Sequence, residues 1–294
     1  DIDIATKLRP ERVITVLDRF DIKTIPTGIE HGTVTAICGS GSFEITTLRK
    51  DVNTDGRHAQ VVFTDDWVLD AKRRDFTMNT LLADDQGHIF DPLKCGMEDL
   101  KQKRVVFVGD PLERIREDYL RILRFFRFHA YYGAGNLDEA ALAACRAEAE
   151  GIDRLSKERI TMEFMKILKA RHPAYVLKNM QENNILSDVF HPSFDVVEFS
   201  SLCKMQQEYN LWEPISRLTL ICGFSEEHIE TVQNRLILSK TQKKALIDTS
   251  RAYYEVGDNA ENIKKLIYRY GRDSAARAVL CAAAVNGDDP STYM

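Results

Sequence analysis

Two aspartates separated by one apolar residue stand at the start of the sequence, in the run Asp1-Ile2-Asp3-Ile4. In a β-strand, side chains at positions i and i+2 point to the same face, with Cα atoms roughly 6.6 Å apart. Two carboxylates held about 4 Å apart at an effective dielectric constant near 20 repel by roughly 4 kcal/mol, and a bound divalent cation removes that repulsion. Carboxylate oxygens are hard ligands that suit Mg²⁺. The spacing therefore makes Asp1 and Asp3 candidate metal ligands; a solvated strand end is the alternative.

A cluster of cations beside an acid and an amide follows in the run Lys72-Arg73-Arg74-Asp75-Phe76-Thr77-Met78-Asn79. A guanidinium makes fixed, bidentate contacts with phosphate oxygens. We interpret this run as a candidate triphosphate clamp, with an ordinary charged helix end as the alternative.

Charged side chains recur every three residues at Asp118, Arg121, Arg124 and Arg127. Apolar and aromatic residues between them form a core face at 100° per residue, which predicts one helix over residues 111–131. Other aromatics lie inside the polar arc, so we expect the arginines to be partly enclosed by protein. Residues 101–130 hold 8 Lys and Arg against 4 Asp and Glu, which makes this segment locally basic. A solvated cationic stripe is the alternative interpretation.

The elements that must position these residues change character along the chain. Short β-rich runs and one helix alternate up to about residue 110, which predicts an α+β unit. Runs at 33–38 and 43–48 around a Gly-containing turn are typical of a hairpin, and Pro10 places a helix over residues 6–20. The polar stretch 49–66 is predicted to be a mobile loop with one short strand inside. Further strands are expected near residues 80–82, 88–90 and 104–108.

The remainder of the chain is predicted to be all-α. Residues 187–199, which include Pro192, are the expected linker. We divide the chain into a head at 1–110, a helical neck at 111–170 and a helical body at 171–294. Besides 111–131, helices are expected over residues 137–150, 157–168, 174–183, 227–236, 240–256 and 260–286.

Composition places the 294 residues among globular proteins, with 44% hydrophobic and 29% charged side chains. Forty basic against 45 acidic side chains give a net charge of −5, so an RNA partner would have to meet a local basic groove. Six cysteines without a CxxC motif indicate buried thiols in a reducing compartment. The apolar run at 278–285 is far shorter than the roughly 18 residues that span a bilayer, so we expect no membrane association.

In this order, the segments resemble the class II tRNA nucleotidyltransferase and bacterial poly(A) polymerase family within the polymerase β-like superfamily. The run from Asp1 resembles its metal motif, 43–49 the strand that follows, and 73–79 its nucleotide motif. Glu117-Asp118-Tyr-Leu-Arg121 resembles the base-selecting motif, and 159–166 the helical motif after it. The resemblance covers roughly residues 1–170. It implies a polymerase β-like head, built from a small mixed or antiparallel sheet with helices, followed by an all-α neck and body.

The resemblance also implies an activity: template-independent transfer of nucleoside monophosphates from CTP and ATP to the 3′ end of tRNA, with release of pyrophosphate. Asp1 and Asp3 would hold Mg²⁺, and Glu44 would be a third catalytic carboxylate. Asp118 and Arg121 would select the base, because C and A share an amine beside an acceptor ring nitrogen, whereas U and G place a carbonyl there. The implied nucleotide-binding residues are Arg74, Asp75, Asn79, Asp118, Arg121, Arg124 and Arg127.

Within the family, the sequence favours CCA addition over poly(A) synthesis or addition of A or CC alone. Residues 49–66, with Asp55-Gly56-Arg57, resemble the flexible loop of enzymes that complete CCA, and so does the Glu-Asp-Tyr-Leu-Arg run. Family members carry a Gly-Gly segment and an Arg-Asp pair upstream of the two aspartates, so we expect a truncated N-terminus. A catalytically silent RNA-binding module is the alternative from another class. We expect a monomer or homodimer in the cytoplasm or an organelle matrix.

Overall fold

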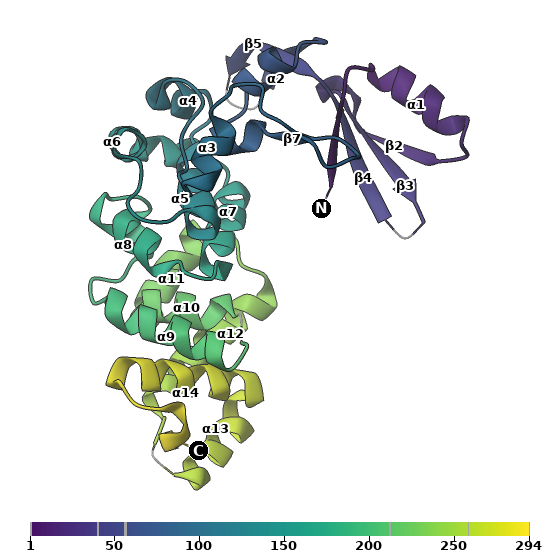
Figure 1. Ribbon diagram of the computed structural model, residues 1–294. Coiled ribbons are helices and arrows are strands. Elements are labelled where there is room, and N and C mark those ends of the chain that lie inside the picture. Colours follow the sequence, from purple (N-terminus) through teal and green to yellow (C-terminus); the bar gives the residue numbers. More distant parts are fainter. Residues whose placement is uncertain (1, 40, 56–57, 212, 258, 294) are drawn as a thin grey trace. The chain divides into compact units, whose positions relative to one another are not determined.

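The computed structural model describes residues 2–39, 41–55, 58–211, 213–257 and 259–293 (Figure 1). The chain divides into two compact units, Asp1–Asp118 and Tyr119–Met294, which we call the head unit and the helical unit. An α+β head followed by helices is the predicted fold class, and it is confirmed. The further division of the helices into neck and body stays a prediction.

A four-stranded sheet forms the first layer of the head unit. Its order is β1 (Asp3–Thr6), β4 (Gly41–Thr47), β3 (Thr33–Cys38) and β2 (Lys23–Gly28). β1 runs parallel to β4, and the other neighbouring strands are antiparallel. Helix α1 (Pro10–Asp18) packs against β2 and β3. Val13 of the helix and Val34 of β3 are buried. Alternate residues of each strand therefore remain for the opposite face of the sheet.

Two sequence predictions for this sheet have different outcomes. The hairpin over 33–48 is confirmed, because β3 and β4 pair from Thr33 and Thr46 to Cys38 and Gly41. The helix over 6–20 was too long at its start. Thr6 belongs to β1, and its hydroxyl accepts the Leu8 amide at 3.1 Å, so the chain turns before α1 begins at Pro10.

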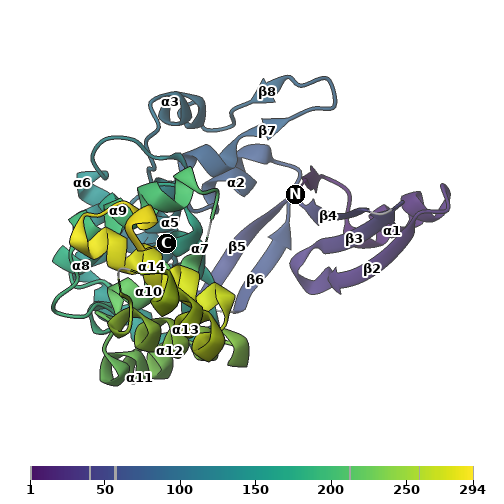
Figure 2. The same ribbon diagram turned by 90° about the horizontal axis from the view of Figure 1, so that it is seen from below.

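The segment after the sheet forms a second hairpin, β5 (Arg49–Asp55) and β6 (His58–Phe63), drawn apart from the four-stranded sheet in Figure 2. The expectation of a loop with one short strand over 49–66 was therefore wrong. Polar composition outweighed the Asp55-Gly56 pair, which is a common signal for a tight hairpin turn. Gly56 and Arg57 themselves lie outside the described residues.

The rest of the head unit consists of short elements. Strands β7 (Leu82–Ala83) and β8 (Ile89–Phe90) pair close to their expected positions. The strand expected at 104–108 was wrong, since that segment makes one isolated bridge, between Phe107 and Phe76. Among the described residues, five short helices complete the unit: η1 (Ile29–His31), α2 (Trp67–Lys72), η2 (Thr77–Thr80), α3 (Gly96–Lys101) and α4 (Pro111–Glu117).

The single helix expected over 111–131 is broken. Asp110 caps α4 and Pro111 is its first residue, but Asp118 has extended backbone angles (φ −157°, ψ 106°) and ends the helix. Helix α5 (Leu120–Tyr132) starts a new run. Apolar residues keep a helical spacing across the break, so periodicity alone does not reveal it. Asp118 is thus not on the helix that carries the three arginines.

The helical unit packs its helices around α10 (Pro214–Ile221), which contacts α7 (Lys157–Lys169), α9 (Val196–Glu208), α12 (Lys240–Tyr254) and α14 (Arg272–Asn286). Every residue of α10 from Ile215 to Ile221 is buried. The buried Arg217 guanidinium donates to Gln206 Oε1 at 2.6 Å and to the Ala170 carbonyl at 2.8 Å, which offsets the cost of burying it. The remaining elements are α6 (Glu139–Ala147), η3 (Ala149–Arg154), α8 (Ala174–Glu182), η4 (Ser187–Val189), α11 (Glu226–Arg235), α13 (Ala260–Tyr270) and η5 (Pro290–Tyr293).

Helices α9 and α10 were not predicted from the sequence, and the expected linker and the last expected helix differ from the structure. The predicted linker over 187–199 contains η4 and the start of α9, and its Phe190, Phe194 and Phe199 are buried, so it belongs to the core. The helix expected over 260–286 divides into α13 and α14 at Gly271, whose φ of 82° favours glycine.

The thiol prediction holds in most positions: four of the six free cysteines are buried, while Cys95 is half-buried and Cys38 exposed. Within the described part of the chain, every helix is too short or too polar to cross a bilayer.

Candidate active site

A groove of about 980 Å³ lies in the head unit. Asp3 and Glu44 line it from β1 and β4, while Arg49, Arg73 and Arg74 line it from the start of β5 and the end of α2. Carboxylates and guanidiniums thus face one cavity, an arrangement that suits a metal-bound polyphosphate.

The two carboxylates sit side by side because β1 and β4 are parallel neighbours. Asp3 is the register partner of Glu44, and both side chains are exposed. Asp1, the other predicted metal ligand, lies outside the described residues. Among the described residues, no three His, Cys, Asp or Glu side chains cluster closely enough to hold a metal ion. Asp3 and Glu44 nevertheless fit a divalent cation as two hard oxygen donors on adjacent strands.

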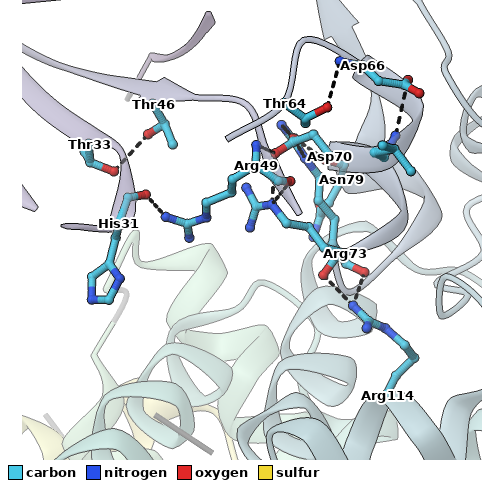
Figure 3. Close-up of polar contacts among 12 residues, drawn as sticks. His31, Thr33, Thr46, Arg49, Thr64, Asp66, Asp70, Arg73, Asn79 and Arg114 are labelled. Atoms are coloured by element: carbon cyan, nitrogen blue, oxygen red, sulfur yellow. Dashed lines mark hydrogen bonds and ion pairs between the residues drawn. The ribbon is translucent and has the colours of Figure 1, made fainter. Parts of the chain in front are cut away.

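One buried carboxylate holds the two arginines of the predicted triphosphate clamp. Asp70 is 2% exposed, and its Oδ1 accepts Arg73 Nε at 2.9 Å (Figure 3). Its Oδ2 accepts Arg74 Nε at 3.1 Å and Nη2 at 3.0 Å. Oδ1 also accepts the Arg49 amide at 3.1 Å, which ties the start of β5 to α2.

These contacts set the protonation of Asp70. Burial alone would raise the pKa of its carboxyl, but the Arg73 guanidinium, the Arg49 N–H and the Arg74 guanidinium outweigh that effect. The pKa of Asp70 therefore lies below its ordinary value of 3.8, and the group is a carboxylate at neutral pH.

A second residue fixes the backbone of the same arginines. Arg114 on α4 is buried and donates through Nη2 to the carbonyls of Arg73 and Arg74, at 2.7 Å for Arg74 (Figure 3). Its Nη1 pairs with Glu117, the residue before Asp118. Arg114 thus connects the clamp to the segment that carries the predicted base-selecting motif.

Asp75 and Asn79, both predicted to bind nucleotide, brace the turn after the clamp. Asp75 is 8% exposed, and its Oδ1 accepts the Phe76 amide at 3.0 Å and Asn79 Nδ2 at 2.9 Å. The Asn79 carbonyl accepts Arg74 Nη1 at 2.7 Å. Neither side chain lines the groove, and their role toward a nucleotide stays a prediction.

The structure gives the four charged residues predicted on one helix different surroundings. Asp118 ends the head unit, whereas Arg121, Arg124 and Arg127 lie on α5 of the helical unit. All four are half-buried, as expected for partly enclosed side chains. Their contact with a nucleotide also stays a prediction.

Two of the α5 arginines contact neighbouring groups in the helical unit. Arg127 Nε donates to Glu163 Oε2 on α7 at 2.6 Å, and Glu163 is 2% exposed. Arg124 and Arg127 both lie over the Phe128 ring, 5.4 and 4.3 Å from its centroid. Arg127 therefore helps join α5 to α7.

Sequence reasoning missed Asp84 and Asp85, two carboxylates that line the groove, and Trp67, a half-buried indole that also lines it. It also missed Asp70 and Arg114, which hold the groove arginines in place. A signal existed for Asp70, which stands three and four residues before the two arginines, the spacing of ion pairs on a helix. Arg114 contacts carbonyls about 40 positions away in sequence, and no local pattern announces such a contact.

Comparisons with known proteins agree on one family. Residues 1–106 match the "Poly A polymerase head domain", and residues 136–197 match the "Probable RNA and SrmB- binding site of polymerase A". The chain is 37% identical over 247 residues to the mitochondrial CCA tRNA nucleotidyltransferase 1 of Danio rerio, covering 83% of this chain and 57% of that protein. It is 42% identical over 174 residues to a CCA-adding enzyme of Streptococcus pyogenes, covering 58% of this chain and 42% of that protein.

A solved structure extends the similarity over the whole chain. The CCA-adding enzyme of Bacillus stearothermophilus in complex with CTP matches with a TM-score of 0.78 and 26% identity, covering 100% of this chain and 71% of that one. By contrast, the chain spans little more than half the length of the curated vertebrate relatives it matches.

Proposed function

Given that the chain belongs to the class II tRNA nucleotidyltransferase and bacterial poly(A) polymerase family, we propose that it adds CCA to the 3′ end of tRNA from CTP and ATP. One observation carries the proposal: Asp3 and Glu44 line the same groove as Arg73 and Arg74. Carboxylates for a cation and guanidiniums for phosphates are the groups that nucleotidyl transfer requires. The names of the relatives, which are CCA-adding enzymes, support the choice of substrate and product.

We propose Mg²⁺ as the cation and Asp3 and Glu44, together with Asp1, as its ligands. When bound, the ion lowers the pKa of the attacking 3′-hydroxyl and offsets charge on the triphosphate. The protein's own part is to bind and orient the nucleotide. Arg73 and Arg74 would hold the phosphate oxygens, with their guanidiniums already fixed by Asp70 and their backbone by Arg114.

We further propose that Asp118 and Arg121 select the base in place of a template. A carboxylate accepts a hydrogen bond from the exocyclic amine of C or A, and a guanidinium donates to the ring nitrogen beside it. U and G would set a carbonyl against the Asp118 carboxylate, which is unfavourable. Asp75, Asn79, Arg124 and Arg127 would support the nucleotide.

The RNA partner would contact the helical unit. The match of residues 136–197 to an RNA-binding family supports this placement. With a net charge of −5 over the chain, affinity for tRNA would depend on local cationic groups rather than on the whole surface. We propose that the protein acts in the cytoplasm or an organelle matrix, since several relatives are named as mitochondrial.

The test is incorporation of radiolabelled CTP and ATP into tRNA that lacks its 3′ CCA. We expect the parent protein to incorporate both nucleotides only when a divalent cation is present. Asp3→Ala should reduce the rate roughly a thousandfold, which corresponds to about 4 kcal/mol of transition-state stabilisation. Asp18→Ala is the matched control, because Asp18 is an exposed carboxylate on α1 that does not line the groove.

Two results would contradict the proposal. A long A tail without C incorporation would indicate a poly(A) polymerase instead. A parent protein that binds tRNA but incorporates no nucleotide would favour the alternative of a catalytically silent RNA-binding module.

A further inference from the structure

We propose that Asp70 is a positioning residue for the nucleotide: its carboxylate fixes Arg73 and Arg74 in the orientation that receives the triphosphate. This inference rests on the proposed function, because it assigns the triphosphate to the groove that these arginines line. Asp70 does not line the groove itself and acts only through its neighbours.

The hydrogen bonds to Asp70 leave the phosphate-binding edge of Arg73 available. Arg73 Nε is engaged by Asp70 Oδ1 at 2.9 Å and by the Arg49 carbonyl at 3.1 Å. Its two terminal Nη groups have no hydrogen-bond partner among the described residues, and the side chain is 20% exposed. The guanidinium is therefore anchored along one edge and offers the other to the groove, the geometry of bidentate phosphate recognition.

Arg74 is held more completely. Two of its nitrogens donate to Asp70 Oδ2, and Nη1 donates to the Asn79 carbonyl at 2.7 Å. Three hydrogen bonds fix the plane of the guanidinium, and at 26% exposure it still lines the groove. Its five N–H donors exceed these three bonds, so donors remain for phosphate oxygens.

The groove lining carries both signs of charge. Arg49, Arg73 and Arg74 contribute three guanidiniums, and the carboxylates come from Asp3, Glu44, Asp84 and Asp85. The buried Asp70 carboxylate accepts hydrogen bonds from the three arginines. A triphosphate that carries a divalent cation matches both sets of groups.

A purely structural role for Asp70 makes a different prediction. Ion pairs at i+3 and i+4 stabilise a helix whether or not a ligand binds. A positioning role predicts that loss of the Asp70 charge weakens binding in proportion to the phosphates a ligand carries. Without the Asp70 charge, the side chains of Arg73 and Arg74 must become ordered when the nucleotide binds. This ordering should weaken affinity for a triphosphate by about tenfold to thirtyfold.

The experiment measures equilibrium binding of CTP, ATP and CMP, with Mg²⁺ and without tRNA, to the whole chain and to Asp70→Asn. We expect Asp70→Asn to raise the Kd for CTP and ATP by about tenfold to thirtyfold and to leave the Kd for CMP within about twofold. Asp70→Glu, which keeps the charge, should bind CTP more tightly than Asp70→Asn and covers the case in which the amide variant does not fold.

Asp99→Asn is the matched control. Asp99 is 5% exposed, pairs with Arg104 at 2.6 Å and accepts the Thr77 hydroxyl at 2.7 Å. Neither partner lines the groove. This variant should lower the melting temperature without a change in CTP affinity.

Unchanged CTP affinity in Asp70→Asn, or an equal loss for CMP and CTP, would overturn the positioning role. Because the assay contains no tRNA, its result is separate from the fate of the proposed function. A protein that binds CTP but extends no tRNA would refute CCA addition and still give a clear answer on Asp70.

Discussion

The contact between Arg127 and Glu163 gives the most specific prediction for the helical unit. Glu163 is 2% exposed and Arg127 16%, and their side chains meet at 2.6 Å between α5 and α7. Glu163→Gln keeps the shape but leaves the enclosed guanidinium without its carboxylate. Breaking a buried ion pair in this way costs about 3–5 kcal/mol.

Two neighbouring contacts place the expected value near the lower end of that range. The Lys166 ammonium lies 3.7 Å from the Glu163 carboxylate but its side chain is 46% exposed, so this pair contributes little to the free energy of unfolding. Arg127 also keeps its position 4.3 Å from the Phe128 ring centroid, a cation–π contact worth about 1 kcal/mol. We therefore expect Glu163→Gln to lower the free energy of unfolding by about 3 kcal/mol.

Urea unfolding followed by circular dichroism, in a double-mutant cycle with Arg127→Met, measures this coupling. The double variant should recover more than half of the loss, because no buried charge is then left without its partner. Glu182→Gln is the control, since Glu182 and Lys178 form an exposed pair at 3.8 Å that should contribute less than about 0.5 kcal/mol. A loss below about 1 kcal/mol for Glu163→Gln would show that Arg127 and Glu163 do not form a stabilising buried ion pair.

Three further predictions follow from the site and the core. Arg121→Ala should reduce discrimination of CTP and ATP from UTP and GTP by at least about tenfold, measured by single-nucleotide incorporation, while its tRNA affinity, measured by a binding assay, changes less. Unchanged nucleotide preference would contradict a role of Arg121 in base selection. Because folding lowers the pKa of Asp70 below 3.8, its carboxylate adds stability above that pH that is lost as the pH falls through the folded value. The stability difference between the parent and Asp70→Asn, measured by urea unfolding, should thus shrink from about pH 6 to about pH 2, and a constant difference would be the contrary result. With a thiol reagent, Cys38 should react fastest in the folded protein, and all six cysteines should react in urea; fast labelling of the buried thiols would contradict the fold. The buried thiols are Cys145, Cys203, Cys222 and Cys281. Burial raises the pKa of each, to about 11 for Cys203.

The residues that line the groove were easier to predict from the sequence than the residues that hold them in place. Asp3 and Arg74 were identified from residue type and spacing, and the structure brings both to one groove. Asp70 and Arg114 were missed, because their importance comes from what they contact. Arg114 reaches the Arg74 carbonyl across 40 positions, a relation that depends on how α2 and α4 pack.

The errors in predicting the fold from the sequence have a similar cause. Helical periodicity predicted one helix through Asp118, yet the extended backbone at that residue separates α4 from α5. The period of apolar residues shows which side chains face the core, and it can continue across a point where one helix ends and the next begins. The hairpin at 49–63 was predicted as a loop because its residues are polar, although main-chain pairing of β5 and β6 does not depend on apolar side chains.

We propose that the groove of the head unit serves to complete CCA on tRNA. The most direct test is to incubate the protein with tRNA lacking its 3′ CCA, all four ribonucleoside triphosphates and Mg²⁺, and to sequence every extended 3′ end. We expect extended ends to read C, CC or CCA and extension to stop after CCA. Ends that carry runs of A, incorporate U or G, or are never extended would contradict the proposal.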